Sequence, residues 1–243
     1  MKIKQIVSAL ERFAPLPLQD GFDNAGLQIG LTEAEATGAL LCLDVTEAVL
    51  DEAIALGHNL VISHHPLIFK GYKSITGKDY VERCILKAIK NDIVIYSAHT
   101  NLDNAYGGVN YKIAEKIGLK NLQVLEPKEN SLQDDLMQAG AGIVGELDEP
   151  ETELEFLKRI KKTFEVGCLR HNKLTGREIR KVALCGGAGA FLLSQAIRSG
   201  ADVFITGEIK YHDYFGHEGD ILMAEIGHYE SEQYTKEIFY SII

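Results

Sequence analysis

The stretch that decides the fold is Leu41–Ser63, LCLDVTEAVLDEAIALGHNLVIS, because it recurs without a gap at Leu184–Thr206 as LCGGAGAFLLSQAIRSGADVFIT. Each copy begins with an apolar strand pattern, continues through a helical pattern and ends in a second apolar strand pattern. Gly57 and Gly200 occupy the same position, where a glycine commonly caps the C-terminal end of a helix. The stretch therefore predicts a strand–helix–strand unit that occurs twice in the chain.

A second match follows the first in the same order. Asp92–Asp103, DIVIYSAHTNLD, aligns with Asp220–Glu232, DILMAEIGHYESE, with one extra residue in the later copy. Each segment carries a histidine that is followed four residues later by a carboxylate. The pairs are His99 with Asp103 and His228 with Glu232. Strand–helix–strand units share composition, so chance explains part of the likeness, but two matches in the same order favour an internal duplication.

Short apolar runs alternate with helical patterns along the chain, which is typical of α/β layers around largely parallel sheets. We expect two related α/β lobes. Residues 1–126 and the C-terminal helix 228–243 form the first lobe, and residues 127–227 form the second. The polar stretch Pro127–Gly140 is the candidate linker. Ligands of α/β sheets bind at the carboxyl ends of strands, so the cleft between the lobes is expected to hold the functional site.

The composition argues against two classes of partner. The chain has 243 residues, with 25 lysines and arginines against 35 aspartates and glutamates, and a formal charge of -10. A negative field of this size repels phosphate backbones and disfavours non-specific nucleic-acid binding, although a local basic patch stays compatible with it. The amphipathic N-terminus lacks the apolar run of a signal peptide or a membrane span, which predicts a cytoplasmic protein with no membrane partner.

Two adjacent histidines follow an apolar strand pattern, in the sequence Ser63-His64-His65-Pro66. Proline stops the strand ladder and disfavours helix at the residue before it, so both imidazoles are expected where the strand opens into a loop. Neighbouring side chains of a strand point to opposite faces, and the pair would therefore reach two ions rather than share one. A surface loop with incidental histidines is the alternative.

Two further clusters follow predicted strands. Asp103 ends the segment that begins at His99 and leads into a helix, although a carboxylate here could instead cap that helix. His228 and Glu232 are four residues apart at the start of the C-terminal helix, so both lie on one face and can approach one ion. An exposed first turn, with acidic residues placed favourably against the helix dipole, is the alternative.

The three clusters together predict a metal site. Its expected ligands are His64, His65, Asp103, His228 and Glu232. Three imidazoles and two carboxylates suit zinc, iron, manganese, nickel or cobalt, whereas magnesium and calcium prefer oxygen ligands alone. Five side chains shared between two divalent transition-metal ions, with one carboxylate bridging, leave positions open for water. Two ions about 3.5–4 Å apart can lower the pKa of a water molecule towards neutrality, which indicates a hydrolase.

A fourth cluster, Thr206–Asp213, occupies the position that the repeat gives to the adjacent histidines in the first half. Within it, Glu208 and His212 are expected beside the metal ligands or at the substrate, where they would act with His99 as catalytic proton-transfer groups. Solvated surface groups are the alternative for all three. The glycine-rich turn Cys185–Ala190 is compatible with anion binding or with a tight strand-to-helix turn.

At these motifs the sequence resembles the Ngg-one-interacting-factor-three-like family, whose bacterial members carry the label GTP cyclohydrolase I type 2 homologue. The resemblance covers the whole chain. Its motifs are Asp23–Gly30, Ser63–Pro66, His99–Asp103, Thr206–Asp213 and Gly227–Glu232. The chain has no room for the inserted middle domain of many relatives and resembles the short form. One departure is Glu208, where many relatives have aspartate.

The resemblance implies a two-lobed α/β fold with a dinuclear metal site in the cleft between the lobes, and a toroidal homohexamer. By motif position it gives the metal the same five ligands. We expect a metal-dependent hydrolase that acts on a small-molecule substrate, either nucleotide-like or a phosphoester. Two alternatives use the same metal site without catalysis. One is a metal-delivery or metal-sensing protein, and the other is a regulatory scaffold.

Overall fold

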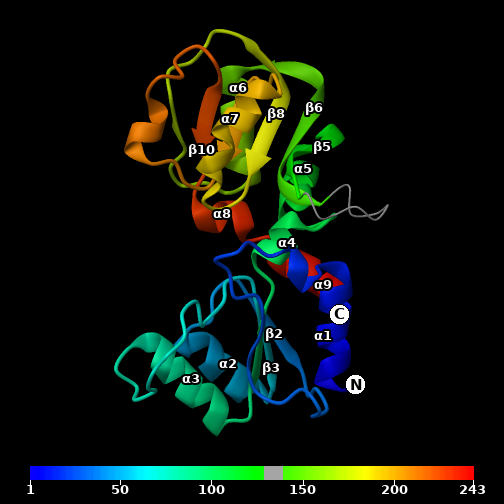
Figure 1. Cartoon of the computed structure of the whole chain (residues 1–243). Coiled ribbons are helices and arrows are strands. Elements are labelled where there is room, and N and C mark those ends of the chain that lie inside the picture. The colour runs from blue at the N-terminus through cyan, green and yellow to red at the C-terminus, as the bar shows by residue number, and fades with distance from the viewer. Residues whose placement is uncertain (129–138) are drawn as a thin grey trace. The chain divides into compact units, whose positions relative to one another are not determined.

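The computed structural model describes residues 1–128 and 139–243. It contains two β-sheets with helices packed on them, so the prediction of an α/β fold is confirmed. The chain divides into two compact units (Figure 1). The first unit contains Met1–Leu102 and Thr235–Ile243, and the second contains Asp103–Tyr234.

The first unit is built on a sheet of four strands in the order β1-β4-β3-β2. The strands are β1 (Gly26–Ile29), β2 (Ala39–Cys42), β3 (Leu60–Ser63) and β4 (Val94–Ser97). β2, β3 and β4 run parallel, and β1 pairs with β4 in the antiparallel direction. β3 and β4 are buried along their whole length, which explains why both read as continuous apolar runs in the sequence.

Four helices cover this sheet. They are α1 (Ile3–Phe13), α2 (Glu47–Leu56), α3 (Tyr80–Lys90) and α9 (Thr235–Ile242), with a 3-10 turn η1 (Leu16–Leu18) after α1. α2 begins after Thr46, whose hydroxyl accepts a hydrogen bond from the Val49 N–H, and it ends at Gly57 in the left-handed conformation. α2 and α3 pack together on one face of the sheet, whereas α9 contacts α1 and β2 (Figure 1).

The second unit is built on a sheet of six strands in the order β5-β6-β8-β9-β10-β7. The strands are β5 (Lys120–Pro127), β6 (Gly140–Thr152), β7 (Arg170–His171), β8 (Glu178–Cys185), β9 (Val203–Thr206) and β10 (Leu222–Glu225). Only β8, β9 and β10 run parallel to one another, and the other pairs are antiparallel. The expectation of largely parallel sheets holds for the first sheet, where three of the four strands are parallel. It is corrected for the second sheet, where parallel pairing is limited to three of the six strands.

In the described part of the second unit, α5 (Val109–Ile117), α6 (Glu153–Thr163) and α7 (Leu193–Arg198) contact strands of the sheet. The helix α8 (His228–Glu232) contacts α5, and the 3-10 turns are η3 (Gly189–Leu192) and η4 (Tyr211–Tyr214). α7 places Leu193 and Ala196 in a core cluster with Phe204 and Met223 of the sheet. α5 contacts β6, β8, α6 and α8. The short helix α4 (Thr100–Asn104) contains the boundary between the units.

The strand register supports the internal duplication. In each unit the three parallel strands follow one another in the same order, with a helix between the first two. In each sheet, one residue from each parallel strand forms a row of paired neighbours. The row in the first sheet aligns in sequence, residue by residue, with the row in the second sheet. These rows are Leu41, Ile62 and Tyr96 in the first sheet and Leu184, Ile205 and Ala224 in the second.

The unit boundaries differ from the lobes expected from the sequence. Residues 103–126 belong to the second unit, because α5 packs on β6 and β8 and because β5 pairs with β6. Most of the candidate linker, residues 129–138, lies outside the described residues. Its ends, Pro127 and Gly140, face each other across β5 and β6, so the stretch connects two strands of one sheet.

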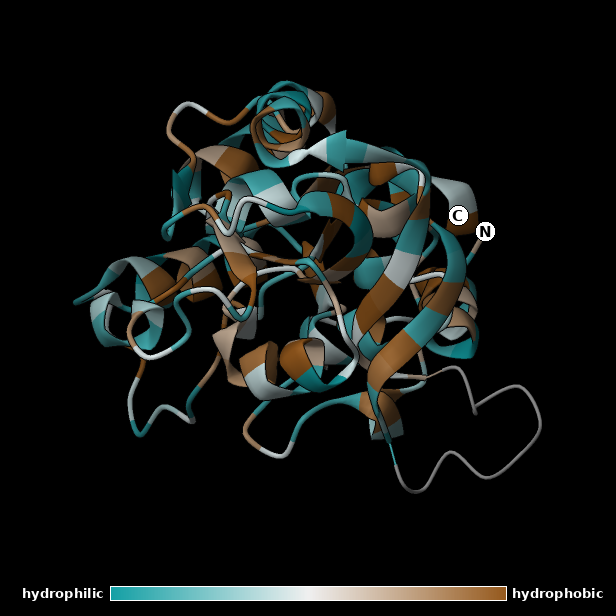
Figure 2. Ribbon diagram, turned by 90° about the horizontal axis from the view of Figure 1, so that it is seen from above, coloured by the Kyte–Doolittle hydropathy of each residue, from teal (hydrophilic) through white to brown (hydrophobic). Residues whose placement is uncertain are grey.

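Hydrophobic and hydrophilic residues alternate along the helices (Figure 2). This alternation is typical of surface helices that bury one face against a sheet. Among the described residues, every helix is too short or too polar to cross a lipid bilayer.

Candidate metal centre

In the first unit, three histidines lie together beyond the ends of β3 and β4. The ring centroids of His64, His65 and His99 are 4.9 to 5.4 Å apart, and one ring nitrogen of each lies within 4.8 Å of the others. Because β3 and β4 are parallel neighbours, the residues that follow them emerge at the same edge of the sheet. The structure thus brings the two histidines predicted as ligands next to the one predicted as a proton-transfer group.

Hydrogen bonds fix the orientation of the two adjacent histidines. Nδ1 of the fully buried His64 lies 2.8 Å from the carbonyl oxygen of Ala98, and Nδ1 of His65 lies 2.8 Å from Oδ1 of Asp44. A carbonyl or a carboxylate oxygen only accepts, so Nδ1 is the donor in both rings. A histidine that donates from Nδ1 binds a metal through Nε2.

His99 is held in the same way by a carboxylate that the sequence analysis did not assign. Nδ1 of His99 lies 2.8 Å from Oδ1 of Asp23, whose other oxygen accepts hydrogen bonds from the N–H and the hydroxyl of Thr100. Burial of Asp23 favours its neutral form, but the hydrogen bonds from His99 and Thr100 outweigh this effect and hold its pKa at about 2. Asp23 is therefore an ionised partner of His99 at neutral pH.

In the second unit, α8 presents the other predicted ligands. His228 and Glu232 lie on one face of this helix, with His228 Nε2 3.1 Å from a Glu232 carboxylate oxygen. A carboxylate oxygen of Asp103 lies within 4.8 Å of one of Glu232. Glu232 is only 3% exposed, and a buried carboxylate is stable when it is paired or bound to a cation. Asp103 does not cap the next helix, because Gly108 is the N-cap of α5.

Glu208 and the glycine-rich turn Cys185–Ala190 both form hydrogen bonds with residues of α8. Oε1 of Glu208 accepts a hydrogen bond of 2.8 Å from His228 Nδ1, so this histidine also binds a metal through Nε2. Gly187 has a φ of +60°, and its N–H donates to Ser231 Oγ over 3.0 Å. A Cβ atom at Gly187 would collide with the Glu232 carboxylate. These contacts favour the tight-turn interpretation of Cys185–Ala190.

Each unit therefore supplies part of the predicted ligand set, and the donor chemistry fits divalent transition metals. All three imidazoles predicted as ligands donate from Nδ1 to an oxygen, and two carboxylates accompany them. Of the predicted catalytic residues, His99 and Glu208 touch this set. His212 lies in η4, is exposed, and contacts the rings of Tyr211 and Phe215.

Comparisons with known proteins agree with the motifs. The family model described as Duf34/NIF3 (NGG1p interacting factor 3) matches residues 1–243. A "GTP cyclohydrolase 1 type 2 homolog" of Clostridium perfringens is 39% identical over 235 residues, which cover 96% of this chain and 87% of that protein. A protein of the same name from Lactococcus lactis is 36% identical over 238 residues, covering 94% and 86%.

Solved structures show the same fold. A hypothetical protein of Staphylococcus aureus superimposes with a TM-score of 0.89 at 32% identity, covering 99% of this chain and 89% of that chain. A Bacillus cereus protein related to NIF3 gives a TM-score of 0.89 at 27% identity, covering 100% and 93%.

Proposed function

The chain belongs to the Duf34/NIF3 family. We propose that it is a metal-dependent hydrolase with a dinuclear site to which both units contribute ligands. The proposed substrate is a small molecule, either nucleotide-like or a phosphoester, in line with the cyclohydrolase name of the relatives. The proposed ligands of the two ions are His64, His65, Asp103, His228 and Glu232.

One observation carries this proposal: every imidazole in the ligand set is held through Nδ1 by an oxygen acceptor. Two of the three acceptors are carboxylates, Asp44 for His65 and Glu208 for His228. Carboxylate–histidine–metal arrangements of this kind orient the ring and raise the basicity of its ligand nitrogen. The exposed His171 also donates from Nδ1, but to the backbone carbonyl of the adjacent Asn172, so the feature that supports the proposal is the carboxylate acceptors of His65 and His228.

The residues around the site can also move protons. When bound, the metal pair supplies Lewis acidity at neutral pH. Asp23 holds a proton on Nδ1 of His99, so Nε2 of His99 can accept a proton from attacking water and return it to the leaving group. Asp23 acts here as a positioning residue that fixes the ring of His99 and leaves Nε2 as the proton acceptor.

The test combines metal content with turnover. We expect about two ions per chain and hydrolysis of a substrate in a panel of nucleotides and phosphoesters. His65→Ala should lower both the number of ions per chain and the rate of hydrolysis, because it removes a metal ligand. His171→Ala is the control, because this exposed histidine lies at the edge of the second sheet. Full metal content and turnover in His65→Ala, or a metal-loaded wild type inactive on the whole panel, would contradict the proposal.

Reversible metal delivery is the second candidate, and one observation favours it. The side chain of His228 is 35% exposed, whereas a tightly held structural ion is usually enclosed by its ligands. A delivery protein would release its ions to a chelator or an acceptor protein within seconds. Retention of both ions for hours would count against delivery and in favour of a resident cofactor.

A further inference from the structure

Phe69 places an aromatic ring against His99, the proposed proton-transfer residue of the first unit. The centroids of the two rings are 5.5 Å apart, and the ring planes are nearly perpendicular, at 86°. Phe69 is nevertheless 46% exposed, so part of its surface is open to a bound molecule. An aromatic side chain offers a large apolar surface, and one that lies beside reacting groups can bind the apolar part of a substrate.

The position of Phe69 is set by the two residues that precede it. Leu67 is buried, and Ile68 packs against the core cluster of the first unit. The backbone N–H of Ile68 donates to Gln28 Oε1 over 3.2 Å, and the Ile68 carbonyl oxygen accepts from Asn24 Nδ2 over 2.6 Å. The loop therefore leaves the core at a fixed place, and Phe69 is its first largely exposed residue.

Two neighbouring residues, Asp23 and Asn24, link this loop to His99. Oδ1 of Asp23 accepts a hydrogen bond from His99 Nδ1 over 2.8 Å and another from the backbone N–H of Asn24 over 2.7 Å. The side chain of Asn24 in turn donates to the residue before Phe69. Both residues belong to the family motif Asp23–Gly30, which contains none of the proposed metal ligands. Orientation of the two rings relative to each other gives this motif a role.

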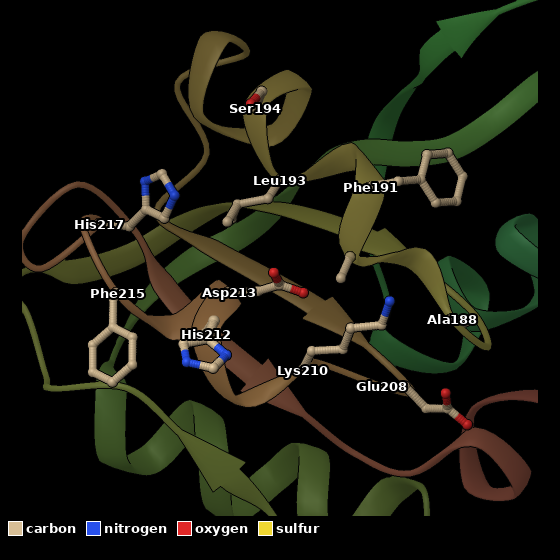
Figure 3. A pocket seen from close by; sticks show the side chains of 11 residues that line it. Ala188, Phe191, Leu193, Ser194, Glu208, Lys210, His212, Asp213, Phe215 and His217 are labelled. Atoms are coloured by element: carbon tan, nitrogen blue, oxygen red, sulfur yellow. The ribbon is translucent and has the colours of Figure 1, made fainter.

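A cavity in the second unit is the other candidate for a contact with the substrate (Figure 3). It is lined by residues of η3 and α7 and by residues of the segment that follows β9. Its lining is partly polar, with one lysine, Lys210, and two carboxylates, Glu208 and Asp213. None of the three clustered histidines is among the described residues that line it. Phe69 touches one of these histidines, which favours Phe69 as the contact nearest to the reacting atoms.

We propose that Phe69 determines substrate specificity by contacting an aromatic or other flat apolar group attached next to the bond that is hydrolysed. A substrate that exchanges a proton with Nε2 of His99 lies within hydrogen-bonding distance of this ring. Because Phe69 lies against the same imidazole, the group next to the reacting bond contacts Phe69. This inference rests on the proposed function, because it takes His99 as the proton-transfer residue.

Isothermal titration calorimetry with phenylphosphonate and methylphosphonate tests this role. Both probes carry the same anionic group, neither has an ester bond to hydrolyse, and they differ in the phenyl ring. We expect the metal-loaded wild type to bind phenylphosphonate more tightly than methylphosphonate. Phe69→Ala should weaken the binding of phenylphosphonate about tenfold, which corresponds to about 1.4 kcal/mol, and should leave the binding of methylphosphonate unchanged.

Two further variants complete the test. Phe69→Leu keeps an apolar side chain and should lose only part of the preference for the phenyl probe. Tyr240→Ala is the matched control, because this aromatic residue is 79% exposed on α9 of the same unit, and both affinities should stay at their wild-type values. A wild type without a preference for the phenyl probe, or an unchanged preference in Phe69→Ala, overturns the assignment.

Metal analysis and turnover of the same samples separate this inference from the proposed function. Loss of the phenyl preference in Phe69→Ala supports the role of Phe69 even if the loaded protein hydrolyses no substrate of the panel, a result that contradicts the hydrolase alone. Turnover by the wild type, together with equal affinities of wild type and Phe69→Ala for phenylphosphonate, overturns the role of Phe69 alone. A protein that binds no metal overturns both.

Discussion

The metal chemistry depends first on which ring nitrogen of each histidine carries the proton. His65 donates from Nδ1 to Asp44, and His228 donates from the same atom to Glu208. A ring that is already fixed in this tautomer loses less rotational freedom when Nε2 binds an ion. At the scale of the residue, Asp44 and Glu208 are therefore positioning residues for the proposed ligands.

Replacement of Asp44 tests this role. We expect Asp44→Ala to lower metal affinity about 10- to 100-fold, because His65 loses the acceptor that orients it. Competition with a fluorescent chelator measures the change. Asp51→Ala serves as the control, since Asp51 is an exposed aspartate of the same unit that pairs with Lys87. Equal metal affinity of the two variants would argue against the role given to Asp44.

Asp23 is tested through turnover rather than metal content. We expect Asp23→Asn to reduce kcat by about 10²-fold or more while the metal content stays at the wild-type value, because an amide, which can donate as well as accept, no longer holds the proton of His99 on Nδ1 and leaves Nε2 as the acceptor. A merely structural role for Asp23 would instead lower metal content and thermal stability together. Wild-type kcat in a fully loaded Asp23→Asn protein would refute the proton-transfer role of His99.

The sequence identified the candidate ligands and Glu208, which orients His228, but it did not identify Asp44 or the role of Asp23. Asp44 lies 21 positions from His65, and Asp23 lies 76 positions from His99. Local patterns do not report contacts over such distances, so only the fold could reveal these pairs. Asp23 did fall within a family motif, which was the one available signal that it has a role.

At the scale of the element, the duplicated strands were predictable because their signal is local. Apolar runs identified β3, β4, β9 and β10, and the repeat fixed their order. The antiparallel additions were only partly predictable. The apolar run Leu122–Leu125 indicates part of β5, but β6 was not expected, and the two-residue β7 pairs with β10, which lies far along the chain. The compact units divide the chain earlier than the expected lobes do, because α5 and β5 follow the first repeat in the chain but pack with the second.

A buried carboxylate in α3, that of Glu82, binds the backbone of the loop that precedes this helix. Oε2 of Glu82 accepts hydrogen bonds from the backbone N–H groups of Thr76, Gly77 and Lys78. The hydrogen bond from the Thr76 backbone is the main cause that lowers the pKa of Glu82 from 4.5 to about 2. Since the folded-state pKa is depressed, the carboxylate stabilises the fold above pH 4.5, and this contribution is lost as the pH falls towards 2.

We expect Glu82→Gln to lower the urea midpoint at pH 7, because the amide accepts these hydrogen bonds less strongly than a carboxylate. The difference from wild type should shrink between pH 4.5 and pH 2, where the native carboxylate becomes protonated. Urea unfolding at several pH values measures both effects, with the exposed Glu52→Gln as control. A midpoint difference that stays constant down to pH 2 would contradict this account.

At the scale of the whole molecule, we propose that copies of the chain assemble into a toroidal hexamer, as the family resemblance implies. Light scattering coupled to gel filtration should then give a mass six times the 26.8 kDa of one chain. A monomer or a dimer at micromolar concentration would contradict this proposal. It would not affect the proposed metal ligands, all of which come from one chain.

We propose that residues of both units of one chain bind two metal ions. Anomalous X-ray diffraction from metal-loaded crystals, recorded on both sides of the metal absorption edge, tests it most directly. We expect two anomalous peaks per chain, about 3.5–4 Å apart, with His64, His65, Asp103, His228 and Glu232 as ligands. Crystals without such peaks, or with ions held by other residues, would contradict it.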